Sequence, residues 1–306
     1  MIGILINKII SLALIMALGF VMVKLRFLQS EDSKSLSKIM MYLIMPCVSI
    51  SAFQVEFTPD VRNGLLLAVG AAVVIHVMLL VLNDILKKLL HLDPLEQVSV
   101  MYSNAGNLII PLVTAILGPE WVIYTSGFCI VQMFLIWSHG KSIVCEEKSF
   151  DIKKVLLNIN MLAIFTGIIL LLLGIRLPAL IKETMDSVGS MIGPAAMMVT
   201  GMLIGGMDVR KIFTYKRVWL VAALRLLLVP LLVIPLLKFT GIAQLVLNGV
   251  RVLMITLLAT TTPSASTIVQ FAQVFDRDAE YASAINVLTT LLCIGTIPVM
   301  VWLYQL

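Results

Sequence analysis

Long apolar runs separated by short polar stretches repeat along this chain. Each run is roughly 18–25 residues long, enough for a helix to cross about 30 Å of hydrocarbon at 1.5 Å per residue. Ten spanning helices are predicted, at residues 4–23, 37–54, 64–88, 96–117, 119–139, 155–175, 179–205, 215–238, 244–273 and 279–305. The pattern therefore predicts an all-α polytopic membrane protein with short loops.

The composition supports this class. Of the 306 residues, 60% are hydrophobic and only 13% are charged, and the mean hydropathy is +1.06. No soluble globular domain of this length has such values. The first run follows no basic leader and has no small-residue cleavage site, so we expect it to be the first spanning helix rather than a removed signal.

The net charge of +5 is compatible with a nucleic acid partner, but its distribution favours loop charge on one side of a membrane. Fifteen Lys and Arg residues lie in or beside the loops on the side of Lys24 and Arg26, against four on the other side. The positive-inside rule then places these basic loops in the cytoplasm and both termini outside. We expect a cell membrane, plasma or inner, and no nucleic acid partner.

Landmark prolines indicate an internal repeat. Pro46 and Pro194 are 148 residues apart, and Pro111 and Pro263 are 152 apart. Five helices in each half force the second half to enter the membrane upside down, which is the inverted repeat of secondary transporters. The predicted units are a first five-helix repeat at 1–139, a cytoplasmic connecting loop at 140–154 and a second repeat at 155–306. Chance spacing of prolines is the alternative.

Two prolines fall mid-way along apolar runs, Pro111 in YSNAGNLIIPLV and Pro263 in ATTTPSAST. Proline lacks the backbone donor, so each helix is expected to break or kink near it. Broken backbone at bilayer depth is tolerated only where protein buries it or where it lines a cavity. Two such breaks in corresponding halves are typical of a transporter's substrate site.

Four stretches in order resemble the auxin efflux carrier family, bacterial type, within the bile-acid/arsenite/riboflavin transporter superfamily. They are GFVMVKLRFLQSEDSKSLSKIMMYLIMPCVSISAF, YSNAGNLIIPLV, DSVGSMIGPAAMMVTGMLIGG and the stretch from ATTTPSAST to IGTIPVM. In the second, Asn104 stands seven residues before Pro111, as the crossover asparagine of that family does. Asn107 and Ile109 depart from the common pattern, which affects the expected substrate more than the fold.

This resemblance implies ten helices in a 5+5 inverted repeat, with broken helices 4 and 9 crossing. It also implies a scaffold of spans 1, 2, 6 and 7 and a transport domain of spans 3–5 and 8–10. The family works by elevator-type alternating access, and a homodimer is expected.

Crossed breaks would make an anion site. A helix start carries roughly half a positive charge and exposes unpaired N–H groups. Two starts facing one point bind an anion without a cationic side chain. We therefore predict that an organic carboxylate is carried, with direct contacts from residues of both breaks. The expected substrate-binding residues are Asn104, Gly106, Asn107, Pro111, Thr261, Thr262, Pro263 and Ser264.

Structural roles are the alternatives for these residues. Buried amides such as Asn104 and Asn107 also bond neighbouring membrane helices, at about 0.6–2 kcal/mol each. The hydroxyls of the second break, including Thr261 and Thr262, also bond carbonyls of their own helix. We expect about half of these hydroxyls to do only that.

Two further groups have a possible charge role. Arg225 lies roughly 12 Å inside its span at 1.5 Å per residue, and an intramembrane charge suggests function. Snorkelling, or bonding to carbonyls freed by Pro230, is its alternative. His76 is isolated in its span, so core packing competes with a proton relay.

Other functions find less support. The chain has no HExxH motif, paired intramembrane aspartates or P-loop, so we expect no enzyme, no metal, no cofactor and no ATP drive. Cys47, Cys129, Cys145 and Cys293 form no CxxC pair, and Cys145 is expected in a loop. Proton or sodium coupling stays open. A membrane-embedded sensor or a channel for a similar anion is the alternative function.

Overall fold

The computed structural model describes residues 2–145, 153, 156–208, 212 and 214–306. Its regular elements within these ranges are helices, apart from one backbone bridge between Ser103 and Ser264. Six helical stretches are long and apolar enough to cross a membrane: Ser30–Ala52, Pro59–Leu90, Pro119–Cys145, Ala179–Gly206, Lys216–Phe239 and Ala279–Gln305. Four shorter apolar stretches accompany them: Ile10–Lys24, Ala105–Ile116, Ile159–Leu172 and Gly249–Thr261.

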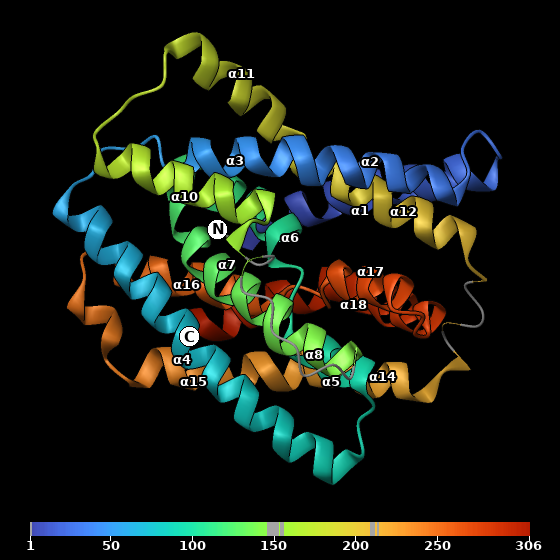
Figure 1. The fold of residues 1–306 in the computed structure, drawn as a ribbon. Helices are drawn as coiled ribbons and strands as arrows, with labels where there is room; N and C mark the ends of the chain where they lie inside the picture. The colour runs from blue at the N-terminus through green and yellow to red at the C-terminus, as the bar shows by residue number, and fades with distance from the viewer. Residues whose placement is uncertain (1, 146–152, 154–155, 209–211, 213) are drawn as a thin grey trace.

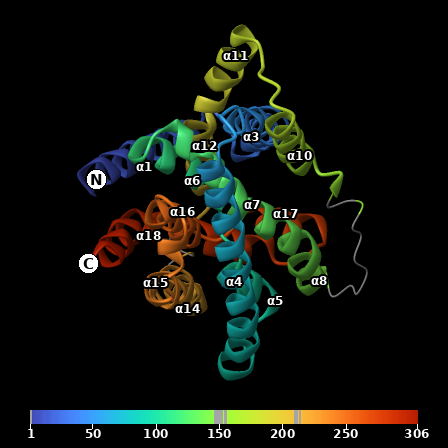
Figure 2. The ribbon, with the colours of Figure 1, turned by 90° about the vertical axis from the view of Figure 1, so that its left-hand side faces the viewer.

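The helices form two layers (Figures 1 and 2). The upper layer of Figure 1 holds α1 (Ile2–Lys24), α2 (Ser33–Ile39), α3 (Met45–Ala52), α10 (Ile159–Leu172), α11 (Ala179–Ser190) and α12 (Ile192–Gly206). Within it, α1 lies along α12, and α3 packs against α10 and α11.

The lower layer holds the remaining helices. They are α4 (Pro59–Leu90), α5 (Pro94–Met101), α6 (Ala105–Ile116), α7 (Ile123–Leu135), α8 (Lys141–Cys145), α14 (Lys216–Ala223), α15 (Val229–Phe239), α16 (Gly249–Thr261), α17 (Ser266–Val274) and α18 (Ala279–Gln305). Helices α6 and α18 also contact α1, and α6 contacts α12, so they lie where the layers meet.

Local sequence explains where the longest helix starts and stops. The hydroxyl of Thr58 accepts a hydrogen bond from Val61 N–H, and Pro59 occupies the first helical position, where its missing donor costs nothing. The helix stops at His91, which adopts a left-handed conformation with φ of 49°. Helix α4 therefore runs for 32 residues and extends beyond the predicted run 64–88 at both ends.

Two predicted boundaries are wrong. The stretch that begins at Pro119 continues to Cys145, so α8 occupies the first part of the predicted loop 140–154, and Cys145 ends a helix instead of lying in a loop. The run predicted at 244–273 becomes α-helical only at Gly249, because Asn248 before it is left-handed with φ of 62°. Residues 146–152, 154 and 155 of the loop lie outside the described residues.

Glycines bring α1 and α12 together within the upper layer. A Cβ on Gly201 would collide with the backbone carbonyl of Met16, and one on Gly19 would collide with that of Met198. Small residues that let helix backbones approach closely are typical of packing between membrane helices, where the hydrophobic effect gives little drive.

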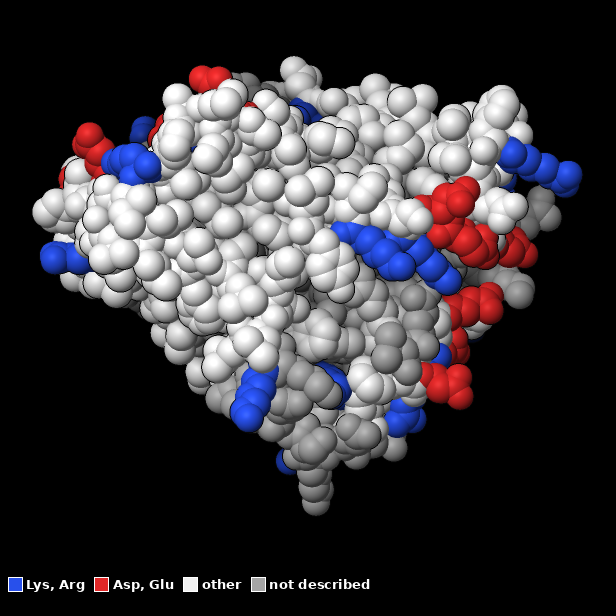
Figure 3. Space-filling view, turned by 45° about the horizontal axis from the view of Figure 1, so that its top comes forward, with Lys and Arg blue, Asp and Glu red and all other residues white. Residues whose placement is uncertain are grey.

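The outer surface fits an apolar solvent. In helix α4, the large apolar residues Val74, Val77, Val81 and Ile85 are exposed and recur every three or four positions, so they form one stripe. Figure 3 shows a broad uncharged surface over the upper and central part of this face, with charged side chains toward its left and right edges and further Lys and Arg side chains right of the centre and in the lower part of the view. A stripe of large exposed apolar side chains like the one on α4 is unusual on a soluble protein.

Candidate functional site

Two interrupted helices meet in the middle of the lower layer. The first interruption, Tyr102–Asn104, separates α5 from α6, and the second, Thr262–Ala265, separates α16 from α17. The second contains Pro263, and Thr262 before it is extended, as a residue preceding proline prefers. The first lies seven residues before Pro111, which itself sits inside α6. The expectation that the helix breaks near Pro111 is therefore wrong in position.

The two interruptions are bonded to each other through their backbones. The N–H of Asn104 donates to the carbonyl of Pro263 at 2.7 Å, and the N–H of Ala265 donates to the carbonyl of Tyr102 at 3.0 Å. Ser103 and Ser264 thus face each other in an antiparallel bridge. Four helix ends converge on this point, which we call the crossover (residues 102–104 and 262–265).

Each interruption is braced by a helix further along the chain, the first by α7 and the second by α18. The side chain of Gln132 in α7 accepts from the N–H and hydroxyl of Ser103 and donates to its carbonyl, at 2.7–3.0 Å. The side chain of Asn286 in α18 donates to the carbonyl of Ser264 at 2.6 Å, and the hydroxyl of Thr289, also in α18, accepts from the N–H of Ser264 at 3.2 Å. These bonds satisfy backbone groups that a broken helix leaves unpaired.

A small polar cluster lies at the starts of α6 and α17. The Asn107 amide donates to Asn104 Oδ1 at 3.1 Å and lies 3.4 Å from the Ser266 hydroxyl, which is itself 3.4 Å from Asn104 Oδ1. All three side chains are partly exposed, unlike the buried residues around them. Asn104 Nδ2 makes no hydrogen bond within the described residues, so a donor is free at this point.

The threonines at the end of α16 and the start of the second interruption have no such freedom. The hydroxyls of Thr260, Thr261 and Thr262 donate to carbonyls three residues earlier in their own chain, at 2.7–2.8 Å. All three residues are buried. Thr261 and Thr262 therefore bond carbonyls of their own helix, the alternative to a substrate-binding role. Ser266, which is not among the predicted substrate-binding residues, lies beside Asn104 instead.

Gly106 and Pro111 lie where α6 meets the upper layer. A Cβ on Gly106 would come 3.0 Å from the side chain of Met45 in α3. Pro111 is buried against Gly193 of α12, where a Cβ on the glycine would come within 2.9 Å of the proline ring. Gly106 is thus next to the polar cluster only by its place in the chain, between Asn104 and Asn107, and Pro111 is a packing contact between the layers.

Arg225 lies beneath the crossover and is fully buried, with 0% of its surface exposed. Its guanidinium donates to carbonyls at the ends of both α5 and α16. The acceptors are Val100 at 3.0 Å, Met101 at 3.4 Å, Thr260 at 2.7 Å and Thr262 at 3.1 Å. The alternatives considered for Arg225, snorkelling or bonding near Pro230, are both wrong.

His76 lies in α4, away from the polar cluster. It is 1% exposed, its Nδ1 lies 2.7 Å from the carbonyl of Ala72, and its ring packs 4.9 Å from that of Phe128. Because a carbonyl only accepts, Nδ1 carries the proton, and Nε2 has no partner among the described residues. The contacts are those of a packed core histidine.

A sequence model of the membrane transport protein family matches residues 4–149 and 143–301, which together take in nearly the whole chain. The chain belongs to this family. The match confirms the resemblance to the auxin efflux carriers. The matching family is one of membrane transport proteins and not of enzymes. A search of curated proteins gives no match.

Sequence reasoning missed one buried carboxylate of this transport protein. Glu96, at the start of α5, is 0% exposed, and its two oxygens accept from Arg217 of α14 at 2.6 and 2.5 Å. The hydroxyl of Tyr281 in α18 also donates to it at 2.7 Å. The only sequence signal is a capping box, in which Asp93 and Glu96 bond each other's backbone N–H.

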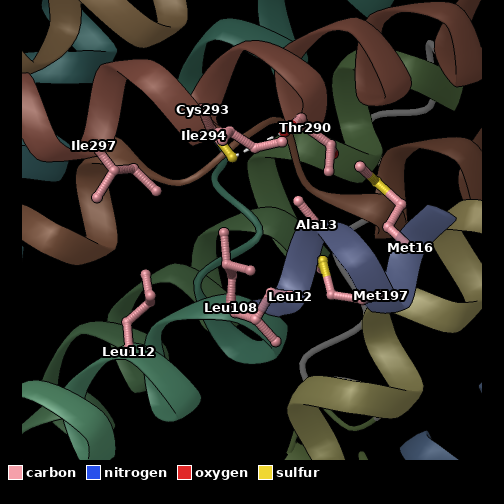
Figure 4. A pocket seen from close by; sticks show the side chains of 10 residues that line it. All are labelled: Leu12, Ala13, Met16, Leu108, Leu112, Met197, Thr290, Cys293, Ile294 and Ile297. Carbon is pink, nitrogen blue, oxygen red and sulfur yellow. Dashed lines mark hydrogen bonds between the residues drawn. The ribbon is translucent and has the colours of Figure 1, made fainter. Parts of the chain in front are cut away.

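An apolar cavity of about 20 Å³, room for roughly one water, lies beside the crossover where the layers meet. Figure 4 shows Leu108 and Leu112 of α6 facing α1 and α18 across it. The side chains that line it are Leu12, Ala13, Met16, Leu108, Leu112, Met197, Thr290, Cys293, Ile294 and Ile297. None of these is charged, so the cavity is a weak candidate for holding an anion.

Proposed function

We propose that this membrane transport protein is a secondary transporter that carries a small organic carboxylate across the cell membrane. The observation that carries the proposal is the hydrogen-bonded crossover, because it sets the starts of α6 and α17 side by side. N–H groups in a first helical turn have no partner within their helix. Together with Asn104 Nδ2 and the Asn107 and Ser266 side chains, they form a neutral donor set for a carboxylate.

The arrangement suits a carrier because binding must be reversible. Helix starts carry roughly half a positive charge each, and neutral amide and hydroxyl donors adjust their geometry easily. The side chains at the mouth of the crossover are partly exposed, so a solute can reach them. The substrate would lie against Asn104, Gly106, Asn107 and Ser266, with Pro263 and Ser264 holding the backbone in place.

We further propose ten spans in a 5+5 inverted repeat. In this reading, α5 with α6 and α16 with α17 are the fourth and ninth spans. The matched bracing supports it, since Gln132 holds Ser103 and Asn286 holds Ser264, in each case from the next span along the chain. The two chain ends lie near each other in both views, and α1 contacts α18, which supports placing both termini on one side of the membrane. The positive-inside rule makes that side the outer one.

The contacts between the layers support an elevator-type movement. Side-chain hydrogen bonds between helices, such as Glu96–Arg217 in the lower layer and Ser51–Asp186 in the upper, join helices of the same layer. The layers meet through apolar side chains, including Leu108 and Leu112. Apolar contacts are non-directional, so the lower layer with its crossover would slide without breaking ion pairs.

The test uses purified protein in proteoliposomes. A thermal-shift screen of small mono- and dicarboxylates first finds acids that stabilise the protein, since a ligand stabilises the state that binds it. The best acid, radiolabelled, is then assayed for uptake into vesicles preloaded with the unlabelled acid. We expect saturable uptake accelerated by the preload. Uptake that neither saturates nor responds to the preload indicates a channel, and binding without uptake indicates a sensor.

A further inference from the structure

Arg225 is positioned by a local change in helix geometry. It lies in a π-helical turn, Leu224–Leu228, between α14 and α15. Such turns insert an extra residue into a helix and are frequent at functional sites. The turn carries the guanidinium beneath the crossover, where Nε, Nη1 and Nη2 all donate to backbone carbonyls. Within the described residues, no carboxylate pairs with Arg225.

The four helix ends at the crossover have opposing charges. The starts of α6 and α17 each carry roughly half a positive charge, and the ends of α5 and α16 each carry roughly half a negative one. Because the interruptions are only three and four residues long, the opposing ends lie close together. Their fields largely cancel, so a crossover of backbone alone has little preference for an anion.

Arg225 bonds only the negative ends. Two of its acceptors, Val100 and Met101, end α5, and the other two are Thr260 in the last turn of α16 and Thr262, which caps that helix. Its charge therefore offsets the two C-terminal half-charges and leaves the two N-terminal ones unopposed. The sum at the crossover is roughly one positive charge, at the side where the polar cluster opens.

We infer that Arg225 is a positioning residue that fixes both helix ends and, through its charge, makes the crossover selective for anions over neutral analogues. This inference rests on the proposed function. Burying a cation without an acidic partner is costly, and neutral donors would satisfy the same carbonyls without that cost. A role in anion selection accounts for the charge, whereas backbone bonding alone does not.

The experiment compares Arg225→Lys, which keeps the charge, with Arg225→Gln, which keeps donors only. Arg251→Gln is the matched control, because Arg251 lies in α16 but is exposed and stacks on Trp121. Binding to each purified variant is measured by calorimetry with three acid and amide pairs from the carboxylate screen. They are benzoate with benzamide, succinate with succinamide, and pyruvate with pyruvamide. The readout is the ratio of acid to amide affinity, which general destabilisation leaves unchanged.

We expect Arg225→Gln to lower this ratio about tenfold or more, as removing one charge at short range in a weakly polar medium should. Arg225→Lys and Arg251→Gln should keep it within about threefold. A folded Arg225→Gln protein with the wild-type ratio overturns the inference, and so does a folded Arg225→Lys protein that has lost it. If Arg225→Gln does not fold, Arg225→Lys decides. Wild-type protein that binds no acid of the whole screen overturns the proposed function itself.

Discussion

Arg217 donates from Nε and Nη2 to the two carboxylate oxygens of Glu96, at 2.6 and 2.5 Å. The pair joins the start of α14 to the start of α5, and Tyr281 links α18 to the same carboxylate. The Glu96 side chain is fully buried, whereas that of Arg217 is 46% exposed. The two partners therefore depend on the pair to different degrees.

This difference predicts unequal losses on substitution. Arg217→Gln leaves a buried carboxylate without its cation, and we expect it to destabilise the protein by about 2 kcal/mol. This loss is smaller than in a fully buried pair, because the Arg217 side chain is half exposed and water can approach the carboxylate from that side. Glu96→Gln frees an arginine that water can solvate and should cost about 1 kcal/mol. Melting of the purified variants in one detergent measures the order.

The double variant Glu96→Gln/Arg217→Gln serves as the control. It leaves no unpaired charge at this position, so it should melt above Arg217→Gln alone. Equal melting of the double variant and Arg217→Gln would show that the unpaired carboxylate is not the source of the loss.

The brace on the first interruption gives a second prediction. Gln132→Leu removes three hydrogen bonds to Ser103 and leaves its buried N–H and carbonyl unpaired. We expect a loss of about 2–4 kcal/mol, together with reduced transport, because the interruption would no longer be held in place. Gln244→Leu, at an exposed glutamine, is the control. Unchanged melting of Gln132→Leu would mean that the interruption is stable without its brace.

The sequence revealed the apolar helices and the second interruption, because both depend on local chemistry. Hydropathy marks the helices, and Thr262–Pro263 disfavours a helix by itself. For the first interruption, the sequence predicts the correct helix but places the break at Pro111, seven residues after Asn104. A proline inside a helix removes a single hydrogen bond, whereas Ser103 is held out of the helix by Gln132, a residue 29 positions away.

The hydrogen-bond partners of the polar residues at the site could not be predicted from the sequence, because they too depend on contacts between distant segments. Gln132, Glu96 and Asn286 all lie in or beside apolar runs, which indicates that each needs a partner. The partner comes from another helix, and no local pattern specifies which one. Arg225 stood out by its charge alone, and its contacts with two helix ends depend on how three helices pack.

Packing of α1 against α12 gives a third prediction. Gly201→Ala places a methyl group against the backbone of Met16, which cannot move without shifting α1. We expect a loss of about 1–3 kcal/mol from overpacking. Gly70→Ala in α4 is the matched control, because it is exposed and nothing lies within 4 Å of an added Cβ. That control should gain about 0.5–1 kcal/mol from helix propensity. Melting curves of both variants decide the matter, and equal shifts would contradict the packing argument.

His76 gives a fourth prediction, which concerns coupling. An imidazolium buried without an anionic partner is costly, so we expect His76 to stay neutral and to act in packing. His76→Asn keeps a donor near the carbonyl of Ala72 but cannot titrate. Its uptake should respond to an imposed pH gradient as the wild type does, with stability lower by about 1–3 kcal/mol because the contact with Phe128 is lost. A folded variant that no longer responds to the gradient would instead identify His76 as a proton carrier.

Asn104 gives the fifth prediction, and it tests the polar cluster directly. Asn104→Ala removes the free Nδ2 donor and the acceptor of both Asn107 and Ser266, whereas the backbone bond from Asn104 N–H to Pro263 is independent of the side chain. Transport should therefore fall by about tenfold or more while melting changes little, since one buried hydrogen bond to a ligand is worth about 1–2 kcal/mol. Asn7→Ala, at an exposed position of α1, is the control and should transport normally.

Ser266→Ala keeps the Asn104 donor, so its loss of transport should be smaller than that of Asn104→Ala. The reverse order would place the substrate nearer α17 than α6, and unchanged uptake in Asn104→Ala would remove the cluster from the site.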